Sequence, residues 1–159
     1  MIDDNTIIHS TLEEGYDFFI TDKWNKKYYF KIATFEVPSG LLSEAIEVMD
    51  NKVDNEPRIF HILSDFDSDI EKVELQLKEK IKKRINKRYL DYKDGNYSIC
   101  QDLEVVGRIL WDDKLKGSGF EYFFEIDGKK ITIDKFIEML QGVEGWNFKF
   151  QIFGTTEDI

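Results

Sequence analysis

One run of apolar residues at helical spacing, with strand-like segments on both sides, constrains the fold of this chain most. Ile70 opens the run, and apolar side chains then recur at steps of three and four as far as Ile85. Ser68 and Glu71 have the spacing of a capping box, and lysines and arginines fill the last turns, where they suit the helix dipole. The pattern predicts a long amphipathic helix over residues 68–88.

The segments before and after this helix are rich in aromatic and β-branched residues, which favour strands. Residues 146–153 alternate apolar and polar without a break, which is the clearest half-buried strand pattern in the chain. Two shorter apolar groups at helical spacing predict short helices over 41–49 and 134–143. The other expected strands cover residues 16–20, 28–37, 58–63, 97–100, 103–111, 120–126 and 129–133.

These elements predict an α+β fold, with mainly antiparallel sheet, one long amphipathic helix and two short helices. The two halves of the chain have a similar order of elements, so each half is interpreted as a ββαβ unit. We expect an N-terminal half over 1–66, the long helix with its connection over 67–93, and a β-rich half over 94–159.

Charge and residue usage exclude several classes of protein. Acidic residues outnumber basic ones 32 to 22, and the net charge of −10 disfavours binding to nucleic acid. No apolar run approaches the length of a membrane helix, the N-terminus has no basic leader, and a single cysteine suits a reducing compartment. Many lysines and isoleucines and only two alanines favour an AT-rich bacterial or phage genome. We therefore expect a cytoplasmic protein with no membrane partner.

Catalytic and cofactor motifs are not evident in the sequence. His9 and His61 stand on different predicted elements, so a histidine metal site is not expected, and His61 is interpreted as structural. Cys100 has no histidine positioned to activate it. The segment around Gly117 lacks the spacing of a phosphate-binding loop. The sequence thus predicts no catalytic residue, no cofactor and no metal.

Clustered aspartates leave one enzymatic alternative open. Asp65 and Asp67 precede the predicted long helix, where acids also serve as caps, and Asp112 and Asp113 follow a predicted strand. If these four carboxylates converged in a cleft, they would suit a metal-assisted hydrolase. A third, weaker option is a small ligand in an apolar pocket between sheet and helix.

Strings in both halves resemble a known family. The second half reads GRILWDD at 107–113, IDGKKI at 126–131 and EGWNFKFQI at 144–152. In this order the strings resemble an uncharacterised bacterial family of domains of unknown function. The first half reads GLLSEAIE at 40–47 and FHIL at 60–63, which is similar to the domain usually found upstream in that family. The resemblance implies a fold and a bacterial origin, and it implies no activity.

The abundance of aromatic residues on predicted strands and turns favours a protein-binding role, because tryptophan and tyrosine anchor interfaces. The leading hypothesis is a non-catalytic interaction module whose partner is another protein, with an inhibitor or immunity-type protein of acidic surface as a special case. The candidate partner-binding residues are Trp24, Tyr28, Trp111, Asp112, Asp113 and Tyr122.

Overall fold

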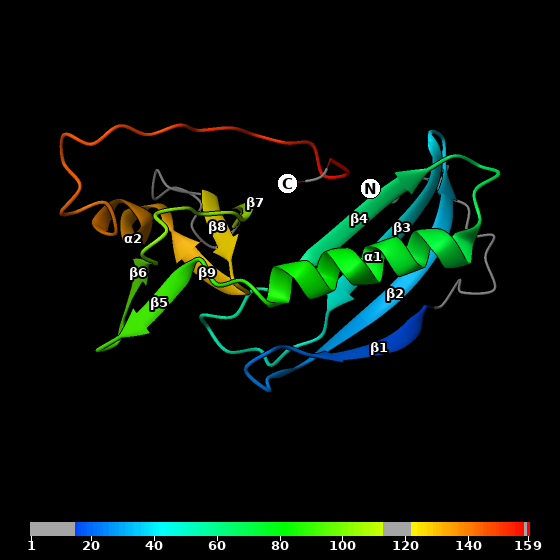
Figure 1. Cartoon of the computed structure of the whole chain (residues 1–159), viewed down its shortest axis with the longest axis horizontal. Coiled ribbons are helices and arrows are strands. Elements are labelled where there is room, and N and C mark those ends of the chain that lie inside the picture. Colours follow the sequence, from blue (N-terminus) through cyan, green and yellow to red (C-terminus); the bar gives the residue numbers. More distant parts are fainter. Residues whose placement is uncertain (1–14, 113–121, 158) are drawn as a thin grey trace. The chain divides into compact units, whose positions relative to one another are not determined.

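The computed structural model describes residues 15–112, 122–157 and 159, and the chain divides into two units (Figure 1). Of the described residues, unit 1 contains 15–49, 59–87, 153–157 and 159, and unit 2 contains 50–58, 88–112 and 122–152. In the part of the chain that the structure describes, both units combine antiparallel sheet with a helix, so the predicted α+β class is confirmed. The grouping differs from the expected one, because the central helix belongs to unit 1 and does not form a separate connection.

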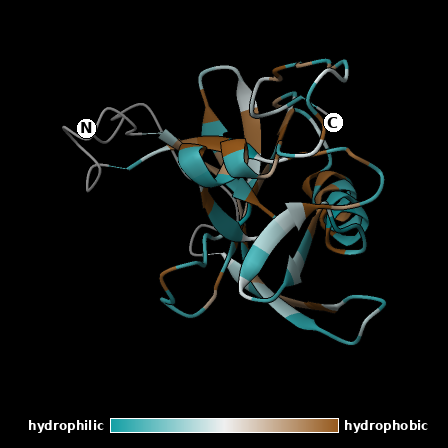
Figure 2. Cartoon of the chain, turned by 90° about the vertical axis from the view of Figure 1, so that its left-hand side faces the viewer, coloured by the Kyte–Doolittle hydropathy of each residue, from teal (hydrophilic) through white to brown (hydrophobic). Residues whose placement is uncertain are grey.

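Unit 1 contains a four-stranded antiparallel sheet in which neighbours in the sequence are neighbours in space. Less exposed and more exposed positions alternate along the first two strands, and Figure 2 colours the chain by the hydropathy of its residues, with brown and teal both present on its strands. This alternation gives each strand one face toward a core and one face away from it. The strands are β1 (Tyr16–Thr21), β2 (Lys27–Val37), β3 (Gly40–Glu47) and β4 (Ile59–Ser64).

The predicted short helix over 41–49 is wrong, because these residues form β3. A two-residue turn joins β2 to β3, and Val37 pairs with Gly40 directly after it. Ser43 and Ala45 point into the core at the spacing of a strand, while the apolar side chains of Leu42 and Ile46 lie on the other face. Apolar residues on both faces of β3 therefore imitate a helical pattern in the sequence. The expected ββαβ order of the first half is wrong for the same reason.

The helix of unit 1 is α1 (Ile70–Ile85), which is shorter at both ends than the predicted 68–88. Asp69, and not Ser68, is the N-cap, and its carboxylate accepts from the backbone N–H of Glu71 at 3.1 Å. At the other end the side chain of Asn86 donates to the carbonyl of Lys82 at 2.7 Å. Both ends are thus fixed by side chains that satisfy backbone groups of the helix.

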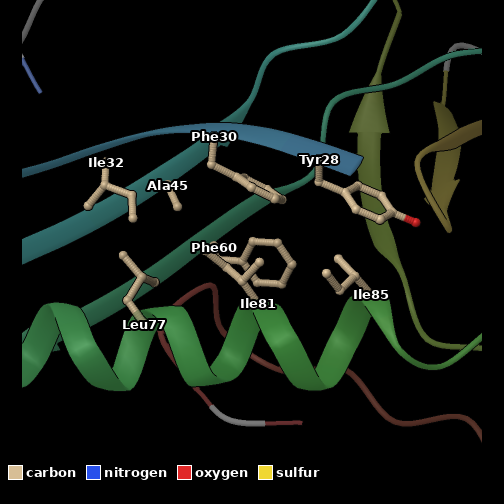
Figure 3. Packing of buried hydrophobic residues seen from close by; sticks show 8 residues of the cluster. All are labelled: Tyr28, Phe30, Ile32, Ala45, Phe60, Leu77, Ile81 and Ile85. Carbon is tan, nitrogen blue, oxygen red and sulfur yellow. The ribbon is translucent and has the colours of Figure 1, made fainter. Parts of the chain in front are cut away.

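The core of unit 1 lies between α1 and one face of the sheet. Leu77 and Ile81 point from the helix toward the sheet, where they meet Phe30 and Phe60, whose rings contact each other edge to face (Figure 3). Close packing of this kind makes each buried side chain costly to truncate. The buried members of this cluster are Tyr28, Phe30, Ile32, Ala45, Phe60, Leu77, Ile81 and Ile85.

Unit 2 contains a three-stranded sheet in the order β7-β8-β9, a separate hairpin and a short helix. Its core joins Ile126 and Ile131 of the sheet to Tyr89 and Leu90, with Phe136 of the helix packed against them. The elements are β5 (Leu90–Lys93), β6 (Asn96–Ile99), β7 (Arg108–Trp111), β8 (Tyr122–Ile126), β9 (Lys129–Thr132) and α2 (Ile133–Glu138).

The predicted strand over 146–153 is wrong as well. These residues follow α2 without pairing to any strand that the structure describes, and no arrow is drawn on them in Figure 1. The ββαβ order expected for the second half is therefore also wrong. The alternating pattern is present in the sequence, but a strand needs a neighbour for its backbone groups, and this segment has none among the described residues.

Neither helix within the described ranges has both the length and the apolar character that crossing a membrane requires.

Candidate functional site

The first candidate surface is the face of the unit 1 sheet that α1 does not cover. Core side chains occupy the face toward α1, so the alternate residues of each strand lie on the opposite face. Apolar side chains predominate there, and Phe19, Ile46 and Leu63 are exposed. We call this surface the open sheet face, and its apolar residues are Phe19, Tyr29, Phe35, Leu42, Ile46, Ile59 and Leu63.

Polar pairs lie among these apolar residues. The hydroxyl of Tyr29 donates to Asp17 at 2.6 Å, and Lys31 forms an ion pair with the same carboxylate at 2.9 Å. The hydrogen bond from Tyr29, followed by the one from Lys31, holds the pKa of Asp17 below its usual range. His61 Nε2 lies 2.8 Å from Glu44 on the neighbouring strand. Asp17 with Lys31, and Glu44 with His61, are therefore polar pairs within a largely apolar face.

Two sequence-predicted partner residues belong to unit 1, and the structure separates them. Trp24 is exposed in the turn between β1 and β2, with the Lys23 ammonium 4.6 Å from its ring centroid. Tyr28 is buried instead, and its hydroxyl donates to Asp22 at 3.0 Å. The prediction of Tyr28 as a contact residue is corrected, because its position on the core side of β2 turns its ring toward α1.

α1 itself carries a buried carboxylate, that of Glu74, which is not among the site residues predicted from the sequence. Glu74 accepts hydrogen bonds from Thr34 at 2.5 Å and from Tyr16 at 3.1 Å, and Thr34 and Ser43 are 2.8 Å apart. Burial, then the charge and the hydrogen bond of Glu74, raise the pKa of Tyr16. The signal in the sequence is that Glu74 falls on the apolar side of the helix, next to Val73. Through these contacts the carboxylate and the hydroxyl groups around it satisfy one another's hydrogen-bonding capacity inside the core.

The second candidate surface lies in unit 2, on the face of the sheet that α2 partly covers. Phe124 meets Phe136 of α2, with ring centroids 5.1 Å apart, and Ile131 beside it is fully buried. Beyond them the cover ends: Trp111 and Tyr122 stand opposite each other, 48% and 54% exposed, with ring centroids 4.9 Å apart. We call Trp111 and Tyr122, together with the exposed Ile109 beside them on the same face, the aromatic row.

The other face of the same sheet carries charged pairs beside the buried ring of Phe123. Arg108 pairs with buried Glu125 at 3.3 Å, and Lys130 pairs with Asp112. Burial, only partly opposed by the charges of Arg108 and Lys130, raises the pKa of Glu56 beside them. Asp112 is thus buried in an ion pair, which argues against the predicted contact with a partner. Asp113, the remaining predicted contact, lies outside the described residues.

The aspartates of the hydrolase alternative are distributed over both units. Asp65 and Asp67 lie in unit 1 in the turn before α1, where the Asp65 carbonyl accepts from Ser68 N–H at 3.0 Å, whereas Asp112 belongs to unit 2. Within the described ranges, no group of three or more His, Cys, Asp or Glu side chains is arranged to hold a metal ion.

The thiol of Cys100 is expected to react slowly. Burial, reinforced by Asp91, raises the pKa of this thiol to about 11. Since only the thiolate reacts, a shift of this size lowers its population about a hundredfold at neutral pH. Alkylation by iodoacetamide at pH 8 should therefore be about a hundredfold slower in the folded chain than in the same chain in urea. Equal rates in the two states would contradict the environment described for this thiol.

Two family models match the chain, one over each part. Residues 13–86 match a family described as Domain of unknown function (DUF7686), and residues 89–157 match Domain of unknown function (DUF7713). The change from one match to the other falls where α1 ends and unit 2 resumes. Comparison with curated proteins and with solved structures finds no match. The resemblance to uncharacterised families of domains is thereby confirmed.

Proposed function

We propose that the chain is a non-catalytic protein-interaction module, which binds a basic protein through the open sheet face of unit 1. The observation that carries this proposal is an aromatic and aliphatic sheet face that α1, the one helix among the described residues of the unit, leaves uncovered. A sheet with apolar residues on both faces is suited to burial on both faces, and the second layer is then supplied by a partner.

The residues of the open sheet face have the character of an interface. Phe19 and Tyr29 stack with ring centroids 4.7 Å apart, which holds two large side chains in fixed positions. Rigid aromatic groups contribute most of the binding energy in many interfaces, because they bury a large area and lose little conformational freedom. The ion pair between Asp17 and Lys31 is exposed and adjoins these rings, as polar groups at an interface rim do.

The charge of the chain favours a basic partner. A net charge of −10 produces a field that accelerates association with a positively charged protein and opposes association with acidic ones. The proposal includes a cytoplasmic location and a bacterial or phage origin, which the single cysteine and the residue usage support.

A capture experiment with two matched variants tests this proposal. Leu63→Glu places a charge on the open sheet face, whereas Leu75→Glu makes the same change on the exposed side of α1. We expect the unaltered chain and Leu75→Glu to retain a basic protein from a bacterial lysate, and Leu63→Glu to lose about tenfold or more in affinity for it. Circular dichroism confirms that both variants fold. Equal retention by the two variants, or no retained protein at low salt, would contradict the proposal.

The inhibitor or immunity-type role is distinguished by its salt dependence. An acidic surface that replaces nucleic acid on a nuclease or another nucleic-acid-binding protein relies on charge, so its affinity should fall steeply as salt rises. Repeating the capture at about 50 and about 200 mM salt measures this dependence. Affinity that does not change with salt would remove the inhibitor role and leave the apolar contact as the source of binding.

A further inference from the structure

The segment after α2 has the composition of a strand and the environment of a surface loop. Apolar side chains at alternate positions, those of Trp146, Phe148, Phe150 and Ile152, are 64% to 90% exposed. The segment forms no strand with any other described residues, yet its match to a family model continues to residue 157. We call residues 146–153 the C-terminal segment, and this match makes it part of the domain.

The sheet of unit 2 has one edge that is already occupied. Residues 54–56 run beside β9: the Asp54 carbonyl accepts from Lys130 N–H at 2.8 Å, and Glu56 N–H donates to Gly128 at 2.9 Å. At the opposite side of the sheet, β7 pairs with β8 alone among the described strands. The edge at β7 adjoins the aromatic row, where the cover of α2 ends.

We propose that the C-terminal segment of one copy pairs as an additional strand with β7 of a second copy, and that the exchange is reciprocal. Trp146, Phe148, Phe150 and Ile152 then lie on the same face as the aromatic row and complete its apolar layer. Backbone groups of the segment and of β7 supply the hydrogen bonds, as in other cases of strand addition. The proposal concerns unit 2 and a different occupant, so it goes beyond the proposed function.

Two features of the chain favour a second copy of the same chain as the partner that pairs with the edge of β7. First, among the described residues the segment does not pair with β7 of its own chain, and the side chains of the two apolar surfaces are 48% to 90% exposed. Second, Lys149 is the only charged residue of 146–153, so the segment can approach another copy despite a net charge of −10, whereas contact through acidic surfaces would be repulsive.

The area available is sufficient for a stable dimer. Three aromatic rings and an isoleucine bury on the order of 150 Å² each, with a similar area on the acceptor. Two reciprocal contacts therefore bury on the order of 2,400 Å², which is above the standard size of a specific interface and in the range of stable homodimers. Exchange of an identical element between copies also closes the assembly at two subunits, with no open end.

Sedimentation of the full chain at about 1 to about 100 µM tests the proposal with a matched pair of variants. Phe148→Asp places a charge on the apolar side of the segment, and Asn147→Asp places the same charge on its polar side. We expect a dimer for the unaltered chain and for Asn147→Asp, and a monomer for Phe148→Asp throughout this range. A monomeric unaltered chain, or a dimeric Phe148→Asp variant, would overturn the proposal.

Cross-linking between differently tagged copies tests the pairing itself. In a Cys100→Ser background, one copy carries Ile109→Cys and the other Ile152→Cys, so a short bis-maleimide can join the two sites only between chains. We expect the linked heterodimer, and we expect Phe148→Asp to abolish it. No link between mixed copies, together with a link inside a chain that carries both cysteines, would show that the segment folds onto its own β7 and overturn the proposal.

The two proposals fail separately. Loss of the dimer in Phe148→Asp leaves the open sheet face intact, so capture of a basic protein by that variant should equal capture by the unaltered chain. Conversely, Leu63→Glu should remain a dimer even though it no longer retains the basic protein.

Discussion

Leu77→Ala lowers the free energy of unfolding of unit 1 by about 3 kcal/mol. The Leu77 side chain is fully buried between α1 and the sheet, in contact with the cluster around Ile32 and Phe60 (Figure 3). Truncation removes apolar area from the core and leaves a cavity that a rigid sheet cannot fill, and the two costs add. Amide hydrogen exchange of α1 and β2 measures the change within unit 1, so unfolding of unit 2 does not obscure it.

Leu75→Ala is the matched control, because it makes the same truncation two residues away on the same helix. Leu75 is 60% exposed, and alanine is a slightly better helix former than leucine, so the free energy of unfolding should change by less than about 0.5 kcal/mol. A loss of similar size in both variants would mean that the effect comes from the helix itself and not from the core.

The helix and its core face were predictable because the signal is local. Val73, Leu77, Ile81 and Ile85 recur at helical spacing, and the same four residues are buried on α1. The predicted ends of the helix are less accurate than its core face, since Asp67, Ser68 and Asp69 all have side chains that are able to cap. Only the path of the chain from β4 selects Asp69 as the N-cap.

The predictions from the sequence are wrong in segments whose structure depends on contacts with distant parts of the chain. Apolar residues on both faces of β3 imitate a helix, because Ala45 enters the core while Ile46 lies on the open sheet face. The alternation of the C-terminal segment is real, but alternation alone does not state whether a neighbouring strand exists. In both segments the local pattern identifies which residues prefer burial, and the partner that buries them lies outside the pattern.

The candidate surfaces were predictable in part. Trp111 and Tyr122 are predicted contact residues because they are aromatic residues on predicted strands, and the structure leaves this pair about half exposed. The open sheet face was not predicted, because the side of the sheet that α1 covers is set by packing and not by the strands themselves. Tyr28 was placed wrongly for the same reason, since the face it occupies is the one that α1 covers.

Gly40→Ala should destabilise unit 1 by about 3 kcal/mol or more. Gly40 begins β3 at a φ of +145°, where a side chain is strained, and a Cβ atom there would lie 2.1 Å from the carbonyl oxygen of Ser64. That oxygen belongs to the backbone of β4, so relief requires the two strands to separate at Leu41 and Ser64. The expected result is faster hydrogen exchange throughout the β3–β4 pair, with unit 2 unchanged.

Gly95→Ala separates the two causes of the loss in Gly40→Ala, which are the backbone strain at positive φ and the close contact with the Ser64 carbonyl oxygen. Gly95 also has a positive φ, +80°, in the turn between β5 and β6, but no heavy atom beyond its own residue and its two chain neighbours lies within 4 Å of the position of an added Cβ. Its cost should therefore be only the backbone strain of alanine in this conformation, about 1 kcal/mol, measured by exchange in unit 2. If Gly40→Ala were no more costly than Gly95→Ala, β4 would yield to the extra atom, and the close approach of the Ser64 carbonyl would not be what requires glycine at position 40.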